Sequence, residues 1–236
     1  MAVRSRVHTP VVFDDPERFM RSALHEERAL LDDVTVASRD NPSRRFLEQV
    51  AVSARESSLA VREAWSRYKT PIDYGIVPLG LPKVAACIAA GLPARLYYAG
   101  YRNNAFDTHV QQPDLHQRLL TYTADAISGF LRDMERLGQA DRVSLLIFSE
   151  FGRRAAENTS LGTDHGTANV LFFAGKAVKG GHYGTPSDLG ALDAGGNLVH
   201  TMDFRHAYAS AIDGWLKLSA ADQVLKGRFA PVPVFG

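Results

Sequence analysis

The sequence predicts an α/β fold with a mostly parallel sheet flanked by helices, preceded by a helical amino-terminal segment. Two observations lead to this prediction. After residue 93, a strand pattern, an amphipathic helix pattern and a second strand pattern follow one another. Before residue 70, helical patterns predominate. A strand, a helix and a further strand joined in this order form a right-handed crossover, which makes the two strands parallel.

The amino-terminal part contains the helical patterns. Apolar spacing and cap signals predict helices over residues 14–31, 42–68 and 82–90. An Asp-Pro pair at 15–16 and an Asn-Pro pair at 41–42 supply an N-cap and a proline in the first turn of the first two helices. We expect this segment to pack on the rest of a single domain.

The strand patterns come later in the chain. Residues 94–99 and the nearly continuous apolar run 142–148 predict two strands, and residues 113–137 predict the helix between them. Residues 169–174 predict a third strand, and residues 204–218 a last helix. The segments that follow these strands are therefore expected to lie at the edge of the sheet where the strands have their carboxyl ends.

Composition narrows the class of protein. Of the 236 residues, 45% are hydrophobic and 22% charged, with a net charge of +1, so no overall field favours nucleic acid. No stretch is long and apolar enough for a membrane span, and the start lacks the apolar region of a signal peptide, which predicts a cytoplasmic protein. The single cysteine, Cys87, lies in an apolar run and excludes a disulfide framework.

Five side chains that can hold a metal follow the predicted strands. Asp107 and His109 come after the first strand, Glu150 directly after the second, and Asp164 and His165 in a later polar loop. Ligands bind at the carboxyl ends of the strands in parallel sheets, so we expect these side chains to converge. Carboxylates and imidazoles without thiolates suit a divalent ion, of which Zn, Mn, Ca and Mg remain open.

Basic side chains near the same loops offer an anion site. Arg153 is the candidate catalytic residue, because a guanidinium can neutralise a developing oxyanion. Arg154 and Lys179 lie in the loops around it. An anion or a glycan bound there without turnover is the alternative to catalysis, as is a segment of a partner protein.

Four segments together resemble the bacterial DUF1501 family: FDTH, SEFGR, NxxxGTDHG and GKAVKGGHYG. That family is placed in the alkaline phosphatase-like superfamily, with the sulfatases. The resemblance implies an alkaline phosphatase-like sheet, a divalent metal centre and hydrolysis of a phosphate or sulfate ester. It matches Asp107, His109, Glu150 and His165 to metal ligands, with Asp164 beside the last.

Family members are usually longer than this chain and are often exported. The resemblance implies that residues 1–236 form a partial domain, with residues 1–70 as a helical segment packed on it. The amino-terminal half that carries the nucleophile in relatives is expected to be missing here. Metal-bound water would then be the attacking group. A second copy or a partner chain could supply the missing half.

Overall fold

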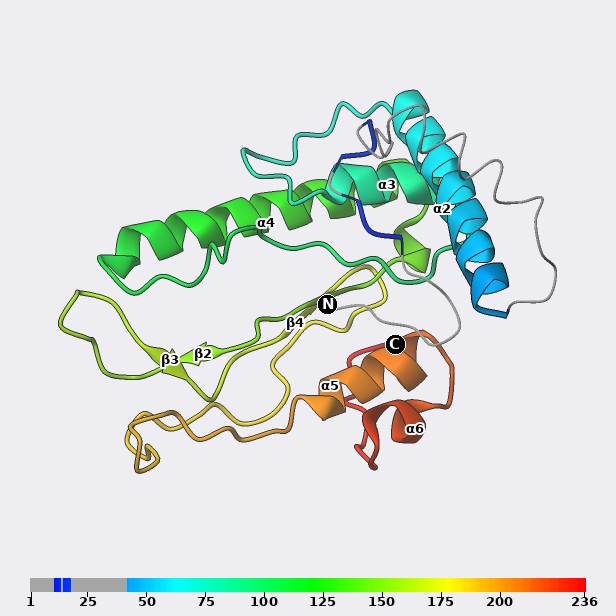
Figure 1. Ribbon diagram of the computed structural model, residues 1–236. Helices are drawn as coiled ribbons and strands as arrows, with labels where there is room; N and C mark the ends of the chain where they lie inside the picture. The colour runs from blue at the N-terminus through cyan, green and yellow to red at the C-terminus, as the bar shows by residue number, and fades with distance from the viewer. Residues whose placement is uncertain (1–10, 14, 18–41) are drawn as a thin grey trace. The chain divides into compact units, whose positions relative to one another are not determined.

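The computed structural model describes residues 11–13, 15–17 and 42–236 (Figure 1). The helix predicted over residues 14–31 lies almost wholly outside the described residues. The chain divides into two compact units. The first comprises residues 1–74 and 78–100, and the second comprises residues 75–77 and 101–236.

Two helices make up the described core of the first unit. They are α2 (Pro42–Arg67) and α3 (Leu81–Ala89), and they pack against each other. Val61 and Ala64 on α2 and Ala85 on α3 are buried, because small and branched apolar side chains at helical spacing line one face. Both helices confirm the ranges predicted from the sequence to within two residues.

The predicted mostly parallel, alkaline phosphatase-like sheet is wrong. Two small antiparallel pairs are present instead: β1 (Leu145–Ile147) pairs with β4 (Phe172–Ala174), and β2 (Gly152–Arg153) pairs with β3 (His165–Gly166). No extended parallel sheet occurs among the residues that the structure describes. The α/β fold class therefore does not hold for this chain.

The error arises at the segment expected to form the first strand. Residues 94–99 are not in a strand, and Leu96 and Tyr98 are 72% and 59% exposed. Without that strand, the run 142–148 has no parallel neighbour, and its central residues pair with β4, which runs the opposite way. An apolar run indicates where a strand can form, but its partner and direction depend on contacts distant in sequence.

The second unit is built on one long helix, α4 (Gln112–Arg136), which confirms the helix predicted over residues 113–137. Ala126, Phe130 and Met134 follow at four-residue spacing and are at most 1% exposed, so they form its buried stripe. Gly138 then takes a φ of +67°, the left-handed conformation that ends many helices. No described helix is long and apolar enough to cross a membrane.

The last predicted helix, over residues 204–218, is formed by α5 (Arg205–Ala209), which continues into a π-helix, η3 (Ser210–Trp215). After a turn comes α6 (Ala221–Leu225), which lies beyond the predicted range. The buried Ser210 hydroxyl accepts a hydrogen bond from the Val232 N–H at 2.7 Å. This bond attaches the carboxyl-terminal segment to the helices, which lie beside it in Figure 1.

Candidate metal centre

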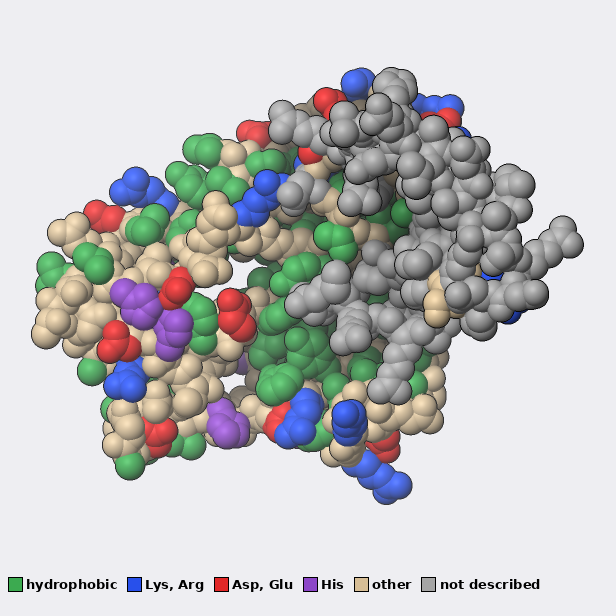
Figure 2. Space-filling view, viewed as in Figure 1, with side chains coloured by type: hydrophobic (Ala, Val, Ile, Leu, Met, Phe, Trp, Pro, Cys, Tyr) green, Lys and Arg blue, Asp and Glu red, His purple; other side chains and the backbone are tan. Residues whose placement is uncertain are grey.

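Asp107, His109 and His165 form a compact group of potential metal ligands. The Asp107 Oδ1 atom lies 2.9 Å from His109 Nε2 and 2.7 Å from His165 Nε2. The two Nε2 atoms are 3.1 Å apart. All three side chains are partly exposed, and Figure 2 shows histidine and acidic side chains gathered on one face of the protein. Their ligand atoms all lie within 4.8 Å of one another.

The β2–β3 pair holds His165. Arg153 lies opposite His165 in the register, and the two glycines, Gly152 and Gly166, lie opposite each other. A Cβ on Gly152 would lie 1.6 Å from the carbonyl oxygen of Ala168, so only glycine allows this close pairing. The Phe151 ring stacks on the His165 imidazole at 3.8 Å between centroids and fixes the plane of that ring.

The loop that carries His109 is joined to the loop before His165 by backbone hydrogen bonds. The Gln111 N–H donates to the Ser160 carbonyl, and the Gln112 N–H donates to the Leu161 carbonyl. Gly162 touches the His109 backbone directly, because a Cβ there would lie 2.3 Å from the His109 carbonyl oxygen. These contacts bring His109 and His165 together across the sequence.

Asn158 organises the same region with both ends of its side-chain amide. Its Nδ2 group donates to the His109 carbonyl oxygen at 3.1 Å and to Asp164 Oδ1 at 3.2 Å. Its Oδ1 atom accepts hydrogen bonds from the N–H groups of Ser160 and Gly162. The loop geometry around the cluster therefore depends on the partly buried side-chain amide of Asn158, whose nitrogen and oxygen both form hydrogen bonds.

Asp164 faces the other nitrogen of His109. Its Oδ1 atom lies 3.5 Å from His109 Nδ1, on the side of the ring away from Asp107. The hydrogen bond from Asn158 lowers the pKa of Asp164, and His109 lowers it further. His109 therefore lies between two carboxylates, with Asp107 near one ring nitrogen and Asp164 near the other.

The charge of Asp107 is also favoured by its neighbours. The hydrogen bond from His165, and then that from His109, lowers the pKa of Asp107 below the ordinary value of 3.8. The carboxylate is therefore ionised under neutral conditions. The cluster thus presents one anionic oxygen and two imidazole nitrogens to a common point.

Arg153 connects the two loops that carry the cluster. Its guanidinium donates to the Phe106 carbonyl oxygen at 2.6 Å and to the Thr163 carbonyl oxygen at 2.7 Å. These carbonyls directly precede Asp107 and Asp164 in the chain. In this structure the residue predicted to be catalytic holds the loops in position, and its role toward an oxyanion stays a prediction.

The remaining candidates are not in the three-residue group. Glu150 is exposed, and the described residues that cluster as ligands do not include it. Arg154 donates its backbone N–H to the Asp164 carbonyl. The Lys179 N–H instead donates to Val234 near the carboxyl terminus.

The sequence analysis quoted segments that contain Asn158 and Phe151 but assigned neither residue a role. Asn158 stands four residues before Gly162, and an asparagine in such a polar turn often bonds nearby backbone N–H groups, which is a usable signal. Phe151 lies within the SEFGR segment, but nothing in the sequence indicates that its ring stacks on a histidine. That contact depends on the β2–β3 pairing.

The donor set fits a divalent metal ion. Zinc binds imidazole nitrogen and carboxylate oxygen at about 2.0–2.2 Å, and one ion at that distance reaches three atoms separated by 2.7, 2.9 and 3.1 Å. Two imidazoles favour zinc or manganese over calcium and magnesium, which prefer oxygen ligands. The partly exposed side chains leave one side of the site open to solvent.

Comparison with known proteins places the chain in a family. Residues 93–226 match the family model described as a protein of unknown function (DUF1501). The chain belongs to the DUF1501 family. The match covers more than half of the chain and includes every residue of the Asp107–His109–His165 cluster. No curated protein and no solved structure matches the chain.

Proposed function

We propose that this DUF1501 chain binds one divalent metal ion, zinc foremost, through Asp107, His109 and His165, and hydrolyses an ester of phosphoric or sulfuric acid there. The observation that carries the proposal is the convergence of three ligand atoms from loops 58 residues apart within 4.8 Å. The proposal rests on this donor set and not on the alkaline phosphatase-like superfamily, because the sheet expected from that resemblance is not formed.

The charges around His109 support a cation at the cluster. Carboxylate oxygens of Asp107 and Asp164 lie 2.9 Å and 3.5 Å from the two ring nitrogens of His109. Two carboxylates beside two imidazoles make an environment that suits a divalent cation.

Each group around the cluster has a separate part in the proposed chemistry. Zinc held by Asp107, His109 and His165 would supply a Lewis acid and activate a water molecule for attack. Asp164 and Asn158 hold the orientation of His109. Phe151 covers one face of His165, which limits rotation of that ring. Arg153 keeps the two loops at the spacing that the ligands require.

Metal binding is tested by zinc titration with calorimetry and by elemental analysis of the purified chain. We expect about one zinc per chain, and His165→Ala to weaken binding by at least about 100-fold because a ligand is lost. His182→Ala is the matched control, since His182 is exposed and outside the cluster. A folded wild-type chain that binds no divalent ion, or equal losses in both variants, would contradict the assignment.

Hydrolysis is tested separately, with p-nitrophenyl phosphate and p-nitrophenyl sulfate as substrates. We expect turnover with zinc or manganese present, its removal by chelator, and its loss in His165→Ala but not in His182→Ala. A zinc-loaded chain that turns over neither substrate would leave the metal site in place and refute the hydrolase.

A further inference from the structure

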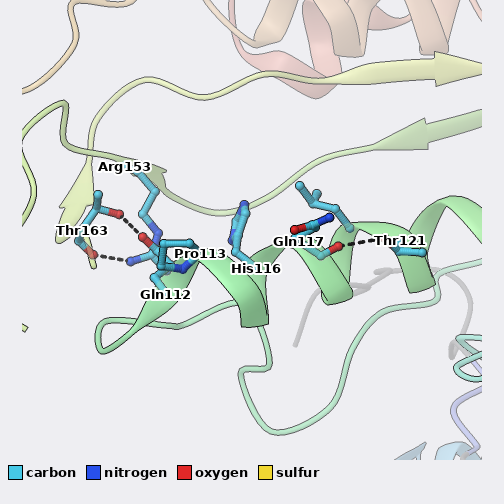
Figure 3. Close-up of a pocket in the computed structure, with 8 residues that line it drawn as sticks. Gln112, Pro113, His116, Gln117, Thr121, Arg153 and Thr163 are labelled. Atoms are coloured by element: carbon cyan, nitrogen blue, oxygen red, sulfur yellow. Dashed lines mark hydrogen bonds between the residues drawn. The ribbon is translucent and has the colours of Figure 1, made fainter. Parts of the chain in front are cut away.

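A groove lies along the first half of α4, next to the loops of the cluster (Figure 3). It has a volume of about 530 Å³, within the range of small-molecule sites. Its lining includes the apolar side chains of Pro113 and Leu120. Arg153 and His116 also line it, and Figure 3 shows both side chains directed into the space between α4 and the segment that carries Arg153.

Arg153 brings an uncompensated positive charge to this groove. Its guanidinium is bound to two neutral carbonyl oxygens, those of Phe106 and Thr163. No carboxylate among the described residues forms an ion pair with it. Guanidinium has more N–H donors than these two carbonyls use, so donors remain for a ligand. Because the carbonyls already hold the group in position, a ligand would bind without ordering a flexible side chain.

His116 adds a second unsatisfied group. Its Nδ1 atom is buried and has no hydrogen-bond partner. The ring packs edge-on against Phe106 at 5.5 Å between centroids, which holds it on the groove wall. Burial, and then the nearby Arg153 charge, lowers the pKa of His116, so the ring is neutral and does not add a second cation.

We propose that this groove binds an aryl anion: a benzene-sized ring that carries a phosphonate, phosphate, sulfate or carboxylate group. The acidic group pairs with Arg153, and the ring lies along Pro113 and Leu120. Charge complementarity selects the anion, and the apolar wall selects the ring. The binding requires no metal, so the inference goes beyond the proposed hydrolase and stands or falls independently of it.

The test is calorimetric titration with phenylphosphonate in excess EDTA. We expect phenylphosphonate to bind about tenfold more tightly than either inorganic phosphate or benzyl alcohol. Inorganic phosphate lacks the ring, and benzyl alcohol lacks the anionic group. If EDTA abolishes the binding, the anion is bound at the metal cluster and the groove assignment is overturned. If inorganic phosphate binds as tightly as phenylphosphonate, the apolar wall has no role and the assignment is also overturned.

Variants on α4 locate the ligand. Leu120→Glu places a carboxylate in the groove, and we expect it to weaken phenylphosphonate binding by at least about tenfold. Leu115→Glu is the matched control, because Leu115 is a similarly exposed leucine of α4 that does not line the groove. Both sites are exposed, so folding is expected to survive. Equal effects of the two variants would refute the placement.

Arg153→Lys keeps the charge but removes the planar fork. We expect it to weaken phenylphosphonate binding by about tenfold, with circular dichroism used to verify folding. Unchanged affinity in a folded Arg153→Lys chain would show that the guanidinium does not recognise the anion.

Discussion

Replacing Gly162 by alanine adds one methyl group at a point where the backbone of His109 passes close by. That Cβ would lie 2.3 Å from the His109 carbonyl oxygen and 2.7 Å from its carbonyl carbon. Favourable carbon contacts require about 3.5–4.0 Å, so the His109 backbone must move by about 1 Å. The φ of Gly162 is not in the left-handed region, which means that the clash and not the backbone conformation causes the strain.

We expect Gly162→Ala to weaken zinc binding by about 10–100-fold, the range found when groups that position metal ligands are disturbed. The same overpacking lowers the free energy of unfolding by about 1–3 kcal/mol. Competition with a chromophoric zinc chelator measures the affinity, and urea unfolding measures the stability.

Gly180→Ala is the control for the added methyl group, because nothing lies within 4 Å of a Cβ at Gly180. It is expected to leave zinc affinity unchanged. A folded Gly162→Ala chain with the zinc affinity of the wild type would refute the argument that this close approach sets the position of His109.

Three further changes test other parts of the structure. Asp203→Asn removes an ion pair with Arg205 and is expected to lower the free energy of unfolding by about 1 kcal/mol at pH 7. The Arg205 hydrogen bonds lower the pKa of Asp203 from 3.8 to about 2, so this contribution is present above pH 3.8 and is lost as the pH falls toward 2. A difference between wild type and variant that stays constant over that range would contradict it. Phe130→Ala empties a site that is 1% exposed and should cost about 3–5 kcal/mol in urea unfolding, whereas Leu115→Ala, 45% exposed, should cost under about 1 kcal/mol. Asn158→Ala leaves backbone N–H groups without an acceptor and should lower both stability, by about 1–3 kcal/mol, and zinc affinity; a fully stable variant would disprove its organising role.

The helices could be predicted because their signals are local. In α4, the buried side chains Ala126, Phe130 and Met134 repeat at a spacing that is readable in the sequence, and Gly138 marks the end. The strands could be located only in part. β1 and β4 lie inside the predicted runs 142–148 and 169–174, but their antiparallel pairing was not foreseen.

Three of the five predicted metal ligands lie close together, but the predicted reason for their convergence is wrong. Asp107, His109 and His165 lie together, although no parallel sheet brings them there. The contact of Gly162 with His109 and the amide of Asn158 join the loops instead. These contacts link residues about 50 positions apart, which no local pattern records.

The sequence by itself determined where the long helices begin and end, which residue types could bind a metal, and membership of the DUF1501 family. Only the tertiary structure decided which of those ligands meet, that Glu150 lies outside the group, and that Arg153 is bound to backbone carbonyls. The physical reason is the separation along the chain over which each kind of interaction acts. Helix periodicity and capping act over a few residues, whereas strand pairing and loop docking depend on close packing between segments distant in the chain.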